Sequence, residues 1–212
     1  SALCTGLEIA MSLPDEFIRM ARALAFYRKF KHRRAKRRGR FFTDNDGLKG
    51  WLDIGSGFYG EAWSHADYPG LVVKISGRAG FGVRGAVPSR EPSLDGWPVF
   101  AEHCLANPHP NLPKIMYFER LSLGISFGIM PYYVPIDPHA DDMDDEILDR
   151  WCGYLEGDAG APKWLWPIIG MRVALGMLVD LHSGNVMKNP DTGDYIMTDP
   201  FSAAANYADY GH

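Results

Sequence analysis

The chain has 212 residues, of which 46% are hydrophobic and 23% are charged, and these fractions are typical of globular domains rather than of disordered chains. No stretch approaches about 18 consecutive apolar residues, and no apolar segment followed by a small-residue cleavage site stands at the N-terminus. The sequence therefore predicts neither a membrane span nor a secretory leader. The three cysteines (Cys4, Cys104 and Cys152) are scattered, which favours reduced thiols in a cytosol.

The net charge of −4 hides two parts of opposite sign. Residues 1–40 contain 11 of the 22 Lys and Arg residues and only three acids, whereas residues 41–212 contain 11 basic and 23 acidic residues. Nine of the thirteen residues in 28–40, the basic run, are Lys or Arg. Such a run stays solvated unless it meets an anion. Three interpretations stay open: contact with nucleic acid or an acidic partner, a solubilising extension, and docking on the acidic remainder of the chain.

A helix is predicted before the basic run. Ser12 is a suitable N-cap, Pro14 suits the first turn, and Asp15 stands at the capping-box position. Apolar residues then recur at helical spacing, at Phe17, Met20, Ala21 and Leu24. We expect residues 1–40 to form an N-terminal helix that includes the basic run.

From residue 50 the pattern changes to short strands joined by glycine turns. Strands are predicted at 50–55, 60–67 and 70–76, with turns at "SGFY" and at Tyr68-Pro69-Gly70. An irregular Gly-rich connection, 77–89, precedes a short predicted helix at 97–106. Further elements are expected as a strand within 109–120, a strand at 124–133, a helix beginning near Asp144, a longer helix at 164–178, and a hairpin of "NVMK" and "DYIMTD".

The first candidate motif is Gly55-Ser56-Gly57-Phe58-Tyr59-Gly60, a G-x-G-x-x-G pattern. A dinucleotide-binding fold would place a helix after it and an acid about twenty residues later. Here the glycines join two predicted strands, and Lys74 follows instead. A glycine hairpin can place its backbone amides against phosphate oxygens. A purely structural glycine hairpin has the same sequence pattern, so both interpretations stay open.

The second candidate is Lys74, within the apolar strand "LVVKIS". A lysine at a strand edge can reach water along its stem. Alternatively it faces a cleft beneath the glycine hairpin and binds phosphate. In that case it needs a carboxylate, for which Glu102 on the following helix is the expected partner and Glu91 the alternative.

The third and fourth candidates are "DLHSGN", which contains Asp180 and Asn185, and Asp199 in "MTDPF". Asp180 can orient or deprotonate an attacking hydroxyl. Asn185 and Asp199 offer oxygen ligands to a divalent cation such as Mg²⁺. As structural alternatives, Asp180 ends a helix and Asp199 forms a turn before Pro200.

In this order, these features resemble a protein kinase: a glycine loop, a strand lysine, a helix glutamate, "HPN", a catalytic loop and a metal-binding aspartate. More narrowly, "GSGFYGEAWSH", "VVKIS", "DLHSGNVM" and "YIMTDPFS" resemble the early serine/threonine kinases of T-seven-type podophages. The resemblance covers about residues 50–202. It implies an α+β, protein-kinase-like fold of two lobes, with a five-stranded antiparallel N-lobe (41–133) and a short, truncated helical C-lobe (134–212).

The resemblance also implies roles for individual residues. The nucleotide ATP would be covered by Gly55, Ser56, Gly57, Phe58 and Gly60 and bound by Lys74, with adenine near Met130, Tyr132 and Tyr133. Asp180 would be the catalytic base, Glu102 would hold Lys74, and Mg²⁺ would be held by Asn185 and Asp199. The expected activity is phosphorylation of host bacterial proteins in the cytoplasm of the infected cell, which helps to shut off host transcription or to counter host defence, with no membrane association.

Several residues depart from the protein-kinase pattern. Leu178 and Val179 replace the usual His-Arg pair, and His182 stands where protein kinases mostly have lysine. "DLH" is typical of aminoglycoside- and choline-type kinases, so a small-molecule kinase is one alternative. Another is a kinase-shaped, non-enzymatic protein that binds host RNA polymerase or nucleic acid through residues 28–40.

Overall fold

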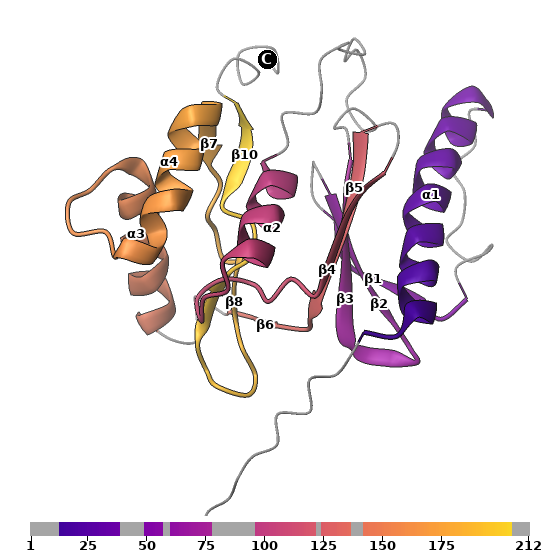
Figure 1. The fold of residues 1–212 in the computed structure, drawn as a ribbon, viewed down its shortest axis with the longest axis horizontal. Helices are drawn as coiled ribbons and strands as arrows, with labels where there is room; N and C mark the ends of the chain where they lie inside the picture. The colour runs from indigo at the N-terminus through magenta and orange to yellow at the C-terminus, as the bar shows by residue number, and fades with distance from the viewer. Residues whose placement is uncertain are drawn as a thin grey trace, which may run out of the picture.

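The computed structural model describes residues 13–38, 49–56, 60–77, 96–121, 124–136 and 142–204. Within these ranges the chain forms four α-helices, one short 3₁₀ turn and ten strands. The largest element of this mixed architecture is a five-stranded antiparallel sheet (Figure 1). None of the helices in these ranges is long and apolar enough to cross a membrane.

The sheet is built mainly from consecutive hairpins. Its strands lie in the spatial order β1-β2-β3-β5-β4. Their bounds are β1 Trp51–Ser56, β2 Gly60–His65, β3 Tyr68–Ser76, β4 Tyr117–Leu121 and β5 Ile125–Pro131. Helix α2 (Trp97–Ala106) lies in the chain between β3 and β4, with Pro98 in its first turn, where the missing N–H has no helical partner to lose.

The predicted strands and the helix at 97–106 are confirmed, but the turn between β2 and β3 lies earlier than expected. Ala66 and Asp67 reverse the chain, and the amide of Ala66 donates to the carbonyl of Gly50 at 2.8 Å. The ring of His65 also accepts a hydrogen bond from the amide of Asp67 at 3.2 Å. The first bond continues the pairing of β1 with β2 and the second lies within the turn, so the reversal is complete before Tyr68, and Tyr68-Pro69-Gly70 begins β3 instead of forming a turn.

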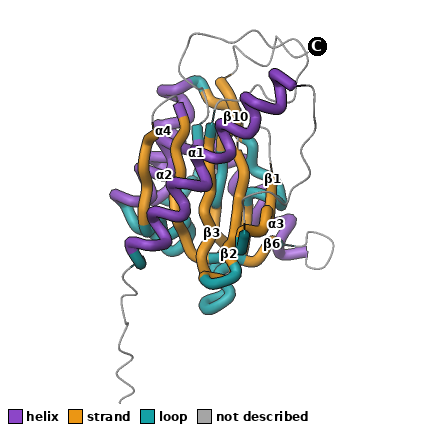
Figure 2. Tube along the Cα trace, turned by 90° about the vertical axis from the view of Figure 1, so that its right-hand side faces the viewer, coloured by secondary structure: helices purple, strands orange, loops and turns teal. Residues whose placement is uncertain are grey.

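Helix α1 (Asp15–Arg38) covers one face of the sheet, as Figures 1 and 2 show from two directions. Phe17, Ala21 and Leu24 are buried against residues of alternating strand positions, among them Val73 and Ile75. The predicted apolar stripe therefore faces the sheet. The helix continues through most of the basic run, to Arg38.

Two ion pairs fasten α1 to the sheet. The guanidinium of Arg22 pairs with Glu119 of β4 at 2.8 Å, and that of Arg28 pairs with Glu61 of β2 at 2.6 Å. Arg28, the first residue of the basic run, also lies 4.8 Å from the ring centre of Trp63. Docking on acidic groups of the same chain is thus realised for this residue.

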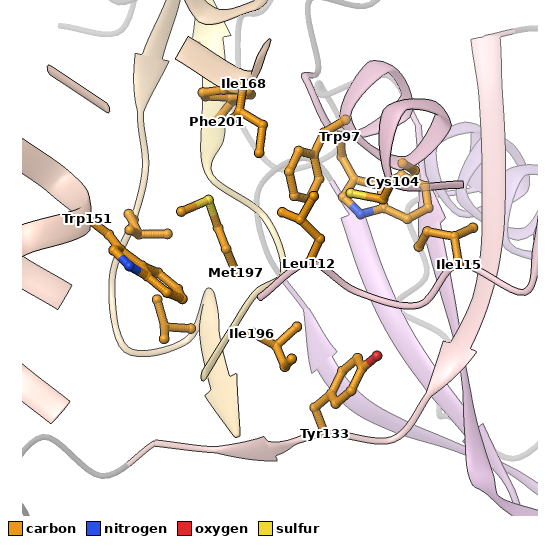
Figure 3. Packing of buried hydrophobic residues seen from close by; sticks show 14 of the residues in the cluster. Trp97, Cys104, Leu112, Ile115, Tyr133, Trp151, Ile168, Ile196, Met197 and Phe201 are labelled. Atoms are coloured by element: carbon orange, nitrogen blue, oxygen red, sulfur yellow. The ribbon is translucent and has the colours of Figure 1, made fainter. Parts of the chain in front are cut away.

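The opposite face of the sheet packs against α2 and the C-terminal part of the chain. That part contains β6 (Val134–Pro135), α3 (Asp142–Glu156), the 3₁₀ turn Lys163–Leu165, α4 (Trp166–Leu175), β7 (Met177–Val179), β8 (Val186–Lys188), β9 (Tyr195–Met197) and β10 (Phe201–Ala204). One buried cluster joins these elements to the sheet, and Figure 3 shows Trp97 of α2, Met197 of β9 and Phe201 of β10 among its members.

The predicted helix over 164–178 is shorter than expected. Gly176 adopts a left-handed conformation with φ of +62° and ends α4, and its amide bonds back to Arg172 and Val173. Residues 177–179 then form β7, which pairs with β10. Asp180 therefore follows a strand rather than a helix. The predicted hairpin of "NVMK" and "DYIMTD" is present as β8 and β9.

Candidate functional site

Lys74 lies on the sheet face that looks toward the C-terminal part of the chain. Side chains alternate along β3, so Val73 and Ile75 face α1, whereas Val72 and Lys74 face the other way. The ammonium Nζ of Lys74 lies 2.5 Å from Oδ2 of Asp199, although 125 residues separate them in sequence. The two side chains are 17% and 22% exposed, so this ion pair is largely shielded from water.

The expected pairing of Lys74 with Glu102 is wrong. Glu102 faces Arg120 of β4, with oxygen–nitrogen distances of 2.6 and 2.7 Å, and this hydrogen bonding lowers the pKa of Glu102. The residue of α2 that lies beside Lys74 is Trp97, whose ring centre is 5.4 Å from Nζ. Glu91 lies outside the described residues.

The segment from Asp180 to Asn185 forms a compact loop after β7. The side-chain amide nitrogen of Asn185 donates to the backbone carbonyl of Asp180 at 2.6 Å, which closes the loop across five residues. The backbone amides of Asn185 and Val186 both donate to the carbonyl of His182. Since the side-chain nitrogen of Asn185 is used within the loop, the side-chain oxygen (Oδ1) is the group left to bind a ligand.

The same loop is fastened to the segment around Asp199. The amide of Asp180 donates to the carbonyl of Pro200 at 2.9 Å, and both the amide and the hydroxyl of Thr198 donate to the carbonyl of Asn185. The pairing of Val179 with Phe201 continues this connection. Lys74, Asp180, Asn185 and Asp199 are therefore brought to one place from three parts of the chain.

The charged groups around Asp199 influence its pKa in opposite directions. Burial raises the pKa of Asp199, and the carboxylate of Asp180 raises it further, while Lys74 and His182 oppose the shift. One carboxylate oxygen of Asp199, Oδ1, is buried and has no hydrogen-bond partner among the described residues. An oxygen of this kind is costly to bury and is suited to a cation.

The residues present fit a magnesium ion of the kind that binds nucleotide phosphates. Mg²⁺ prefers oxygen ligands and is commonly held by one or two carboxylates, with water and phosphate completing its shell. Asp199 Oδ1 and the side-chain oxygen of Asn185 (Oδ1) supply such ligands. Within the described part of the chain, no group of three His, Cys, Asp or Glu side chains forms a metal site, so the protein alone would supply only part of the coordination shell.

The glycine motif is described in part. Gly55 and Ser56 end β1 and Gly60 begins β2, whereas Gly57 and Phe58 lie outside the described residues. A Cβ added to Gly60 would lie 2.8 Å from the backbone oxygen of Ile75, whereas one added to Gly55 would meet nothing within 4 Å. A residue without a Cβ is thus required at position 60 for the close approach of β2 to β3, whereas a Cβ at position 55 would meet no described atom.

The residues expected near adenine divide into buried and exposed groups. Met130 is buried in the cluster that joins the sheet to the C-terminal part, together with Val72. Tyr132 is 38% exposed, and its amide donates to the carbonyl of Gly70 at 2.9 Å. Tyr133 is a core residue whose hydroxyl accepts a hydrogen bond from the amide of Lys114, so its part as a wall of an adenine slot is not supported.

Comparisons with known proteins add little to this geometry. No protein-family model matches the chain, and no curated protein matches it. A weak structural neighbour is a chain from the CAK complex of Chaetomium thermophilum bound to ATP-γ-S, with 15% sequence identity and a TM-score of 0.36. The match covers 71% of this chain and 46% of that chain, so this chain spans less than half the length of its neighbour.

Proposed function

We propose that the chain is an ATP-dependent phosphotransferase that moves the γ-phosphoryl group to a serine or threonine hydroxyl of a protein. The observation that carries the proposal is the meeting of Lys74, from β3, with Asp199 and the loop of Asp180 and Asn185. In protein kinases the phosphate-binding lysine stands on the third strand, and an aspartate and an asparagine hold the metal ions. The order of elements in this chain is the same.

Each residue of the site has a role that its surroundings support. The Lys74 ammonium has three N–H donors, so it can bind phosphate oxygens beside its bond to Oδ2 of Asp199. Asp180 stands beside the same pair and can accept the proton of the acceptor hydroxyl while the new phosphorus–oxygen bond forms and the bond to the β-phosphate breaks. Asn185 and Asp199 would hold Mg²⁺, which neutralises charge on the phosphates when it is bound.

The test is phosphoryl transfer by the wild-type chain and by Asp180→Ala. With radiolabelled ATP and a bacterial lysate, we expect labelled phosphoserine or phosphothreonine with the wild type and none with the variant, at unchanged thermal stability. Asp191→Ala is a matched control, because Asp191 is an exposed acid in the β8–β9 turn. Transfer at the wild-type rate by Asp180→Ala would refute the proposed role of Asp180.

A small-molecule acceptor is the second candidate, favoured by "DLH" at residues 180–182. In this structure the ring of His182 accepts from the amide of Gly184 and contacts the Asn185 side chain, so the histidine supports its own loop. ATP turnover with a panel of amino- and hydroxyl-bearing metabolites, without labelled protein, would select this candidate over the first.

The identity of the acceptor proteins is a further part of the proposal. The motif resemblance leads us to propose host bacterial proteins in the cytoplasm of an infected cell as acceptors, and the basic run as a contact for host RNA polymerase or nucleic acid. The charge of residues 28–40 supports such a contact, although Arg28 is already bound to Glu61. Mass spectrometry of a lysate after expression of wild type or Asp180→Ala would identify the acceptors.

A further inference from the structure

Trp97 lies beside Lys74, over a glycine of the sheet. Gly128 of β5 is the register partner of Lys74, and a Cβ at Gly128 would lie 2.9 Å from Cη2 of Trp97. The indole ring therefore lies on the one residue of β5 that has no side chain, directly next to the lysine. Trp97 is 1% exposed and also packs against Phe118.

The face of this ring is a suitable partner for a cation. The ammonium of Lys74 lies 5.4 Å from the ring centre, within the range of about 6 Å over which an aromatic face attracts a cation. The attraction is strongest for tryptophan and increases when the pair is shielded from water. Since the Lys74 side chain is 17% exposed, the contact is of the shielded kind.

No carboxylate from α2 competes for this place. Glu102 is bound to Arg120, and the only carboxylate on Lys74 among the described residues is Asp199. Asp199 is also suited to a cation, because its Oδ1 has no hydrogen-bond partner among the described residues, and a cation bound there would draw the carboxylate charge away from the ammonium. The tryptophan face then remains as the partner that keeps the ammonium in position.

We infer that Trp97 is the positioning residue of Lys74, and that its ring replaces the helix carboxylate with which protein kinases orient the phosphate-binding lysine. This inference rests on the proposed function. Helix α2 would thus align the lysine through an uncharged contact, which holds the ammonium without neutralising it and leaves its full charge for the triphosphate.

The test changes the charge distribution of the ring and keeps its shape. Tryptophan analogues with one, two and three ring fluorines are introduced at position 97 by nonsense suppression, because fluorine progressively weakens the negative face of the ring. We expect KM for ATP to rise stepwise with fluorine number while the melting temperature stays constant, and kcat/KM to fall by about three- to thirtyfold at the end of the series. Trp97→Leu should weaken nucleotide binding at least as much.

Trp63 provides the matched control. It is buried, and its ring contacts the guanidinium of Arg28 at 4.8 Å on the face of the sheet away from the site. The same fluorine series at Trp63 should leave KM for ATP unchanged. A flat series at Trp97, or equal effects at Trp97 and Trp63, would overturn the inference.

One further variant separates this inference from the proposed function. If Lys74→Ala has no effect on nucleotide binding or phosphoryl transfer, the proposed function fails. If Lys74→Ala abolishes transfer while the fluorine series at Trp97 is flat, the proposed function stands and the role of Trp97 is refuted.

Discussion

Glu102 of α2 binds Arg120 of β4 through both carboxylate oxygens, at 2.6 and 2.7 Å. Both side chains are about half exposed, and ion pairs in such positions contribute about 1 kcal/mol or less. Because Arg120, and not Lys74, binds both carboxylate oxygens of Glu102, we predict that Glu102→Gln changes kcat/KM for ATP by less than about twofold and stability by about 1 kcal/mol or less. Steady-state kinetics of the purified variant provide the measurement.

Arg120→Gln is the control for Glu102→Gln, since it breaks the same ion pair from the other side. The two variants should agree in stability and in activity. A loss of activity in Glu102→Gln alone, by two orders of magnitude or more, would show that this glutamate moves to Lys74 when nucleotide binds.

The second prediction concerns the pH dependence of cation binding. Burial, aided by Asp180, raises the pKa of Asp199 above the ordinary value of 3.8. Asp199 therefore takes up a proton at a higher pH than an exposed aspartate does, and a protonated carboxyl does not bind a divalent cation. Mn²⁺ binding, followed by calorimetry with a nonhydrolysable ATP analogue, should be complete above this raised pKa and should be lost as the pH falls through it.

Two variants move the midpoint of this titration in opposite directions. Asp180→Asn removes the like charge that raises the pKa of Asp199, so the midpoint should move to lower pH. Lys74→Met removes the positive charge that lowers this pKa, so the midpoint should move to higher pH. Unchanged midpoints in both variants would show that the three groups do not interact.

The third prediction compares two glycines of the same motif. Gly60→Ala places a methyl group 2.8 Å from the Ile75 carbonyl oxygen, which forces β2 and β3 apart, and it should destabilise the fold by about 1–3 kcal/mol in urea unfolding. Gly55→Ala meets nothing within 4 Å and should leave the fold intact. If the backbone at Gly55 approaches a triphosphate, Gly55→Ala raises KM for ATP without a change in stability; an unchanged KM would place the triphosphate elsewhere.

The fourth prediction concerns the attachment of α1 to the sheet. Phe17 is fully buried and lies 4.6 Å from the ring of Tyr68 and 5.8 Å from that of Trp51. Phe17→Ala should lower the free energy of unfolding by about 3–5 kcal/mol, as measured by urea denaturation. Arg19→Ala is the control, because Arg19 is exposed on the same helix. Equal stability of the two variants would mean that α1 detaches readily.

Local sequence patterns predicted much of the sheet and of α2. β1, β2, β3 and the helix at 97–106 were recognisable because apolar runs, glycines and Pro98 act over a few residues. The early end of α4 also had a local signal, since Gly176 follows Arg172 and Val173 at the place where a left-handed cap is favourable. The helical pattern beyond it hid this signal.

The partners of Lys74 were beyond what such patterns reveal. The choice of Glu102 rested on its place in the next helix, but the buried side of α2 carries Trp97, which lies over Gly128, and leaves Glu102 beside Arg120. Likewise, a contact between Lys74 and Asp199 across 125 residues depends on how the C-terminal part docks. A bulky aromatic at the start of α2 and a glycine in the middle of β5 were the available clues to Trp97, and each has many ordinary explanations when taken alone.

Asn111, in the connection between α2 and β4, is bonded to β9 through both its backbone and its side chain. Its carbonyl accepts from the amide of Met197 at 3.0 Å, and its side-chain amide donates to the carbonyl of Tyr195 at 3.0 Å. These two bonds attach the connection between α2 and β4 to β9, in the C-terminal part of the chain. Asn111 therefore couples the segment that leads into the sheet to the strand that immediately precedes Asp199.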